Sequence, residues 1–301
     1  MADKPSRALV LYGDGLARGL DTSSRNGHLN TLASLSCCGF LSLPNAPPNE
    51  GEDERIAREF AVLLDSYDLN GIESSVIASL SERFMGMKTA LVTNHSGLES
   101  LCHKLSITTF HIDQLVAAGS SCAVVTCELL KLLGFEGEGA SETSQFDLVF
   151  FHVGVGKGDK DMATSIEYMH GLVGSILQIA PSGSAIGSRL HLSVAMSYGR
   201  VLEDDSIRYP IEMSKNEMDP RLSAIVPRQS YTMRGETPRE NVRHHCPILL
   251  AQFQDGVTRV DLAKAFSFLE FTQKGGILVI PADRFVHEVA FKLWKAPKYG
   301  A

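Results

Sequence analysis

The chain has 301 residues, 44% of them hydrophobic, and its 28 Lys and Arg residues against 35 Asp and Glu residues give a formal net charge of -7. This acidic balance, with no basic run interleaved with aromatic side chains, argues against nucleic acid as a partner. The length suffices for one large α/β core or two small ones, and no run of the roughly 18 apolar residues that a membrane-spanning helix needs is present.

Short apolar runs alternate with segments whose apolar residues recur at helical spacing. The predicted strands are Ala8–Tyr12, Phe40–Leu43, Thr89–Thr93, Ile107–His111, Leu148–His152, Leu190–Met196 and Ile248–Gln252. The predicted helices are Glu54–Leu64, Ile72–Phe84, Gly97–Leu105, Ala123–Leu133, Asp161–Ile179 and, near the C-terminus, Phe285–Trp294. This alternation predicts an α/β sandwich with a mostly parallel sheet. We expect residues 1–301 to form a single domain, in which the long polar stretch 203–245 is a lid or an excursion.

The first predicted strand ends in Gly13-Asp14-Gly15, which places a carboxylate at the C-terminal edge of the sheet, where α/β proteins bind ligands. The flanking glycines allow a tight turn and a close approach to a ligand. The spacing of Gly13, Gly15 and Gly19 also resembles a loose dinucleotide fingerprint. However, the second strand is followed by Pro44-Asn45 and lacks the acidic residue that would hold a ribose hydroxyl.

A second group of polar residues follows the predicted strand Leu148–His152. His152 is the last residue of this predicted strand. A glycine-rich turn that contains Lys157 follows it and leads to Asp159 at the start of a predicted helix. Backbone N–H groups at Gly156 and Gly158, with Lys157 as the counter-charge, would bind a phosphate group there. The alternative is a tight solvated turn in which an aspartate caps the helix.

Six cysteines lie mostly in apolar runs and show no metal or disulfide spacing, which favours reduced thiols in the cytoplasm or the nucleus. Cys246 adjoins His244 and His245, so a nucleophilic cysteine is a further hypothesis for this position.

The order of these segments resembles the alkaline-phosphatase superfamily and, within it, a degenerate, shortened cofactor-independent phosphoglycerate mutase. The resemblance rests on the strand ending at Asp14 and on four later segments, 28–41, 87–98, 147–153 and 236–249. It implies a three-layer α/β/α sandwich in which Asp14 is a metal ligand. It also implies that one of Thr22, Ser23 and Ser24 is the phosphorylatable residue.

The metal ligands of that family are largely replaced. Where the family has an Asp-His pair after a strand, this chain has Met196-Ser197, and Lys157 stands at the position of an acidic ligand. A thioether and a neutral hydroxyl are poor ligands for Mn²⁺ or Mg²⁺. The remaining candidates, Asp14, His152, Asp159 and either His244 or His245, would make one weak site, so we expect no cofactor or one divalent metal, Mn or Zn.

Two functions remain open at this point. The first is a non-catalytic member of the phosphatase and mutase fold that binds a phosphorylated small molecule or a protein partner. The second is a metal-dependent phosphohydrolase or phosphomutase with an altered site, formed by Asp14, one of Thr22, Ser23 and Ser24, His152, Asp159 and His245.

Overall fold

The centre of the molecule is an eight-stranded sheet with the order β12-β2-β11-β8-β1-β7-β3-β4. In that order the strands are Leu278–Pro281, Cys37–Ser42, Ile248–Phe253, Leu190–Met196, Arg7–Asp14, Leu148–Gly154, Thr89–Val92 and Thr108–Phe110. The computed structural model describes residues 6–22, 27–67, 78–137, 139–155, 159–211, 230–234 and 236–297.

The sheet is parallel except at β11, which runs antiparallel to both of its neighbours. The parallel pairs are β1 with β7 and β8, β3 with β4 and β7, and β12 with β2. The carboxyl ends of these strands therefore lie along one edge, and Asp14 is the last residue of the central strand β1.

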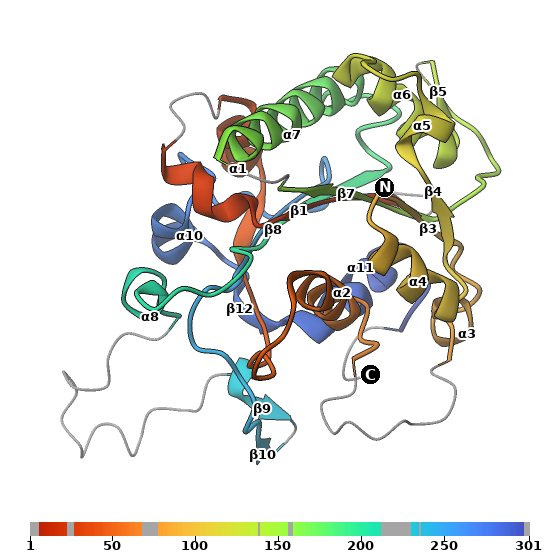
Figure 1. Ribbon diagram of the computed structural model, residues 1–301. Coiled ribbons are helices and arrows are strands. Elements are labelled where there is room, and N and C mark those ends of the chain that lie inside the picture. The colour runs from red at the N-terminus through yellow and green to blue at the C-terminus, as the bar shows by residue number, and fades with distance from the viewer. Residues whose placement is uncertain are drawn as a thin grey trace.

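Helices cover both faces of the sheet and complete a three-layer sandwich (Figure 1). One face carries α1 (Gly27–Leu35), α6 (Cys122–Leu132), α7 (Asp159–Ile179) and α10 (Phe268–Lys274). The other carries α2 (Glu52–Leu63), α4 (Ser96–Lys104) and α11 (Phe285–Lys292). Residues of β1 alternate between two buried clusters: Leu9 and Leu11 face the first layer, whereas Val10 and Tyr12 face the second. This period of two explains why a strand buried on both faces is apolar throughout.

Short elements connect these layers. The helical turns are α3 (Leu80–Arg83), α5 (Ile112–Leu115), α8 (Asp205–Arg208), η1 (Leu16–Thr22), η3 (Ser230–Thr232) and η4 (Ala282–Arg284). Two small hairpins pair β5 (Phe135–Glu136) with β6 (Gly139–Ala140) and β9 (Met233–Arg234) with β10 (Thr237–Pro238).

The predicted architecture is confirmed: all seven predicted strands belong to the sheet, which is mostly parallel. The structure describes the predicted helix Ile72–Phe84 only from residue 78 onward, and in this part the helix α3 spans Leu80–Arg83. The stretch 203–245 contributes α8 and the β9–β10 hairpin, and residues 212–229 and 235 lie outside the described part. Its role as a lid stays a prediction.

Two further predictions concern membrane-spanning helices and the state of the cysteines. Among the described residues, no helix is long and apolar enough to cross a membrane. All six cysteines are free thiols.

Candidate functional site

The carboxylate of Asp14 is bound by a guanidinium group. Arg55 Nη1 donates to Asp14 Oδ1 at 3.0 Å and Arg55 Nη2 donates to Asp14 Oδ2 at 2.9 Å, a two-pronged contact. The two side chains are only 6% and 4% exposed. Hydrogen bonds between two ionised groups are stronger than neutral ones, and the planar fork of arginine matches a carboxylate. The carboxyl edge of β1 therefore holds a positive charge supplied by the chain itself.

Helix α2 positions Arg55. Three acidic residues occupy its first turn, where the helix dipole favours negative charge, and Gly51 N–H donates to Glu54 Oε2 at 3.0 Å. Arg55 and Glu59 are one turn apart and so share a face, and Arg55 Nη1 donates to Glu59 Oε2 at 2.9 Å. Ile56 and Phe60 are buried beside them, which fixes this face of the helix against the sheet.

Ser197 completes the surroundings of Asp14 from the end of β8. Its hydroxyl donates to Asp14 Oδ1 at 3.1 Å and accepts from Gly15 N–H at 3.0 Å. Gly15 has φ +73°, and a Cβ at Gly199 would lie 3.2 Å from the Gly15 Cα, so two glycines allow these turns to meet. The Ser197 hydroxyl thus gives the Asp14 carboxylate a further hydrogen-bond donor.

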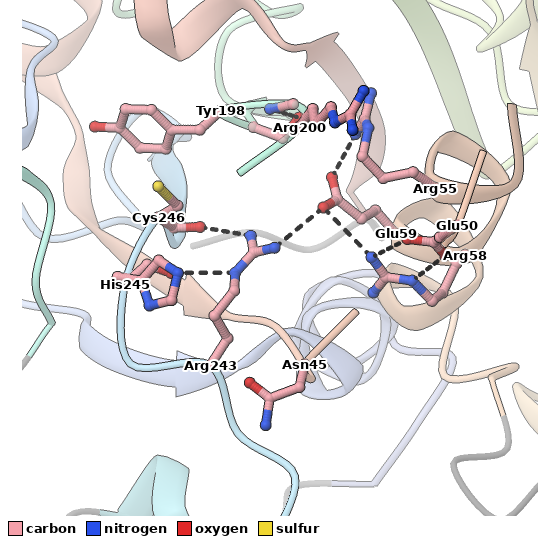
Figure 2. A network of polar contacts seen from close by, with 12 residues as sticks. Asn45, Glu50, Arg55, Arg58, Glu59, Tyr198, Arg200, Arg243, His245 and Cys246 are labelled. Atoms are coloured by element: carbon pink, nitrogen blue, oxygen red, sulfur yellow. Dashed lines mark hydrogen bonds and ion pairs between the residues drawn. The ribbon is translucent and has the colours of Figure 1, made fainter. Parts of the chain in front are cut away.

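Glu59 is the centre of a wider buried network (Figure 2). Besides Arg55, its carboxylate lies 3.6 Å from Arg243 Nη1 and 3.9 Å from Arg58 Nη2. Arg58 also forms an ion pair with Glu50, and the Arg243 Nη2 donates to Cys246 O at 2.8 Å. Burial raises the pKa of Glu59, and the guanidinium groups of Arg243 and Arg55 oppose that effect. One buried carboxylate is therefore shared by three guanidinium groups, which come from α2 and from Arg243.

A second bidentate ion pair joins Arg18 in η1 to Asp205 in α8. Arg18 Nη1 and Nη2 donate to the two Asp205 oxygens at 2.8 Å and 2.7 Å. Burial would raise the pKa of Asp205, but the hydrogen bonds from Arg18 and from the Leu202 N–H, together with the Arg18 charge, outweigh burial and lower that pKa to about 2. This carboxylate, like that of Asp14, is neutralised by an arginine.

The described residues around Asp14 do not fit a divalent metal. Both Asp14 oxygens face hydrogen-bond donors, and the adjoining residues at the end of β8 are Met196 and Ser197. In the part of the chain that the structure describes, no three His, Cys, Asp or Glu side chains come together in a group that could hold a metal ion. A metal at this corner would have to displace Arg55, leaving a buried guanidinium without its main partner.

His152 lies beside this network at the carboxyl end of β7. Its Nδ1 is 3.0 Å from Thr93 Oγ1, and its ring stacks on Tyr12 with centroids 5.8 Å apart. Its Nε2 is fully shielded and has no hydrogen-bond partner among the described residues. A cavity of about 430 Å³ adjoins it, lined by Val92, Thr93, Asn94, His95, Ile112, Phe151, His152, Val153, Gly154, Val155 and Tyr168. The strand ends next to Asp14 therefore border a small, mostly apolar cavity.

Burial lowers the pKa of His152 from 6.5 to about 4, and burial also lowers that of His191 to about 3. Between pH 6.5 and 4 the unfolded chain binds protons at these positions that the folded chain does not bind. The free energy of unfolding should therefore fall as the pH falls through this window, by about 3 kcal/mol from His152 alone. Chemical denaturation at a series of pH values measures this slope. The His152→Gln variant should flatten it in part, and equal slopes in variant and parent would contradict the prediction.

The other predicted site residues are placed as follows. Thr22 ends η1, and Asp159 begins α7, but neither side chain is described; Ser23, Ser24, Gly156, Lys157 and Gly158 lie outside the described residues. His245 forms an isolated β-bridge with Pro210, and its carbonyl oxygen accepts from Arg243 Nε at 3.1 Å. The nucleophile, the phosphate-binding turn and the metal ligands at Asp159 and His245 stay predictions. Cys246 is fully buried, and burial raises the pKa of its thiol to about 12, which does not suit a nucleophile.

Sequence reasoning missed Arg55 and Glu59, as well as Arg18 and Asp205. The signal for the first pair was the Glu52-x-x-Arg55-x-x-x-Glu59 spacing, since these charges fall on the same helix face as Ile56 and Phe60. No comparable local signal joins Arg18 to Asp205, which are 187 positions apart.

The fold is similar to those of solved structures that include a cofactor-independent phosphoglycerate mutase and an alkaline phosphatase. The PH0037 protein from Pyrococcus horikoshii superposes with a TM-score of 0.61 at 11% identity, over 99% of this chain and 100% of the other. A cofactor-independent phosphoglycerate mutase from Thermoplasma acidophilum gives 0.52 at 12% identity, over 94% and 98% of the two chains.

An alkaline phosphatase from the Antarctic bacterium TAB5 gives a TM-score of 0.50 at 8% identity, over 98% and 99% of the two chains. No protein-family model matches the chain, and no curated protein matches it by sequence. The superpositions show that the fold is shared, but at such low sequence identity they do not show the activity, which has to be argued from the site.

Proposed function

We propose that this chain is a non-catalytic member of the alkaline-phosphatase fold that acts by binding. The observation that carries the proposal is the bidentate ion pair in which Arg55 donates to both oxygens of Asp14. Two-metal phosphoryl transfer uses cations to activate the nucleophile and to neutralise charge in the transition state. An arginine whose hydrogen bonds are all committed to carboxylates supplies neither a bound hydroxide nor an open coordination position.

The proposed ligand is a phosphorylated small molecule, bound at the carboxyl edge of the sheet. Ligands of open α/β sheets bind along this edge, and two cavities occur there among the described residues. One is the 430 Å³ cavity beside His152, and the other, of about 930 Å³, lies where Ser42, Pro44, Asn241 and Arg239 meet near the end of β2. Lys157 would supply the counter-charge for a phosphate group. A protein partner is the other outcome of the test, and we place this binding in the cytoplasm or nucleus because the cysteines are free thiols.

Purified protein should contain less than stoichiometric Mn and Zn by elemental analysis, and it should not hydrolyse p-nitrophenyl phosphate or interconvert phosphoglycerates when Mn²⁺, Mg²⁺ or Zn²⁺ is supplied. The Asp14→Asn variant is the control, since it removes the carboxylate that any metal chemistry would need. Turnover in the parent that this variant abolishes would overturn the proposal and favour an active metal-dependent phosphohydrolase or mutase. Calorimetry with phosphate esters tests the ligand class separately; if they do not bind, only the protein-partner form of the proposal remains.

A further inference from the structure

We infer that the corner around Asp14 is a guanidinium-binding site, in which Arg55 acts as a built-in counterion in the structural place of a metal. This goes beyond the proposed function because it names the chemical class that the site accepts: a planar cation with N–H groups on all its edges. It concerns how the fold is held together and does not depend on what the protein binds elsewhere.

The five N–H donors of the Arg55 guanidinium all have carboxylate acceptors. Nη1 donates to Asp14 at 3.0 Å and to Glu59 at 2.9 Å, Nη2 donates to Asp14 at 2.9 Å and to Glu52 at 2.7 Å, and Nε donates to Glu52 at 3.1 Å. An arginine has five such donors in a fixed plane, so the three carboxylates form a complete receptor for it.

Two of the three carboxylates of this receptor are sheltered from water, whereas Glu52 is 57% exposed. The side chains of Asp14 and Glu59 are 4% and 0% exposed, so their charges need a partner in place of lost hydration. Burial lowers the pKa of Arg55, but the carboxylates of Glu52, Asp14 and Glu59 outweigh burial and raise that pKa, so the guanidinium stays charged. A lysine ammonium would be a compact point charge and could not fill this planar set of acceptors.

Buried arginine alone does not define such a receptor, as Arg7 shows. Its guanidinium is buried too, but it donates to the backbone carbonyl oxygens of Leu133, Gly134 and Ser141. The cavity left by truncating Arg7 would be lined by these carbonyl groups and, in the described part of the chain, by no carboxylate that accepts a hydrogen bond from Arg7. Arg7→Ala is therefore a control: a guanidinium ion could fill its cavity, but among the described residues it would find no carboxylate there to form an ion pair with.

The test is chemical rescue of Arg55→Ala with methylguanidinium, at concentrations far below those that denature proteins. We expect truncation to lower the melting temperature by roughly 10 °C, as for a broken buried ion pair. Methylguanidinium should restore at least half of this loss in a saturable manner, because it binds the folded state. The parent should not respond to methylguanidinium, and sodium chloride at equal ionic strength should not rescue Arg55→Ala.

Two further variants make the outcome decisive. In the double variant Asp14→Asn/Arg55→Ala, methylguanidinium should no longer raise the melting temperature. In Arg7→Ala, the rise in melting temperature should be less than a third of that in Arg55→Ala. Equal rescue of all three variants, or no saturable rescue of Arg55→Ala, would overturn the inference. Rescue by Mn²⁺ but not by methylguanidinium would also overturn it, because the site would then be a metal site.

Should Arg55→Ala not fold, Arg55→Lys replaces it. That variant keeps the charge, but all its N–H donors are on one nitrogen and cannot match the planar set of acceptors. It should melt below the parent and respond to neither methylguanidinium nor Mn²⁺; a melting temperature equal to that of the parent would count against the inference. None of these outcomes depends on phosphatase activity or on calorimetry with phosphate esters, so this inference and the proposed function can fail separately.

Discussion

Replacing Glu59 by alanine should lower the free energy of unfolding by about 3–5 kcal/mol, the range measured when one partner of a buried ion pair is removed. Glu59 is fully buried and lies within ion-pair distance of Arg55, Arg58 and Arg243. Without it, three guanidinium groups face one another with fewer acceptors in a region of low dielectric constant. Urea denaturation followed by circular dichroism measures the loss.

Glu52→Ala is the matched control for this experiment. Glu52 is on the same helix and pairs with the same arginine, but its side chain is 57% exposed, so water replaces much of what the ion pair provides. We expect it to cost less than about 1 kcal/mol. Similar losses for Glu52→Ala and Glu59→Ala would show that the buried network contributes no more than a surface pair.

The second large effect is expected at Phe60, which packs behind the ion network. Its ring is fully buried and lies 5.7 Å from that of Tyr12 and 5.3 Å from that of Phe150, measured between centroids. Phe60→Ala removes these contacts and leaves a cavity, which should cost about 3–5 kcal/mol. The same denaturation experiment measures it. Phe60→Leu retains most of the volume and should cost clearly less; a loss below about 1 kcal/mol for Phe60→Ala would mean that α2 shifts to refill the space.

The sheet and its two helical layers could be predicted from sequence because the signal is local. Runs such as Leu148–Gly154 and Leu190–Met196 are apolar throughout, as strands buried on both faces must be, and the predicted bounds lie within two residues of those observed. The strand β12 was missed because Leu278–Pro281 lies at the edge of the sheet, where Leu278 is 69% exposed. The antiparallel direction of β11 depends on how the chain returns to the sheet, which composition does not encode.

The candidate site was predicted in part. The position of Asp14 at the carboxyl edge followed from a strand ending between two glycines. The loss of metal ligands, inferred from Met196-Ser197, stays a prediction. The identity of its partner did not follow, because a helix rich in Glu and Arg is ordinarily a solvated surface with ion pairs along it. Only the packing of α2 against β1 turns Arg55 inward, and that contact joins residues 41 positions apart.

The same limit applies to His152. Its position at the end of a strand suggested an imidazole available for ligation, and this stays a prediction. The structure adds that its Nδ1 is engaged with Thr93 and that burial lowers its pKa to about 4. Both properties depend on the neighbouring strand β3, which pairs with β7. Local sequence indicated where the imidazole would lie and gave no information on its protonation.

The positive charge at the carboxyl edge of β1 is joined to the chain by covalent bonds, and this distinguishes it from any ion taken up from solution. It cannot dissociate, be exchanged for a competing element or be withdrawn by a chelator. The amount of folded protein in a cell should therefore stay constant when the supply of transition metals is depleted, a condition under which proteins that need such ions to fold lose their stability.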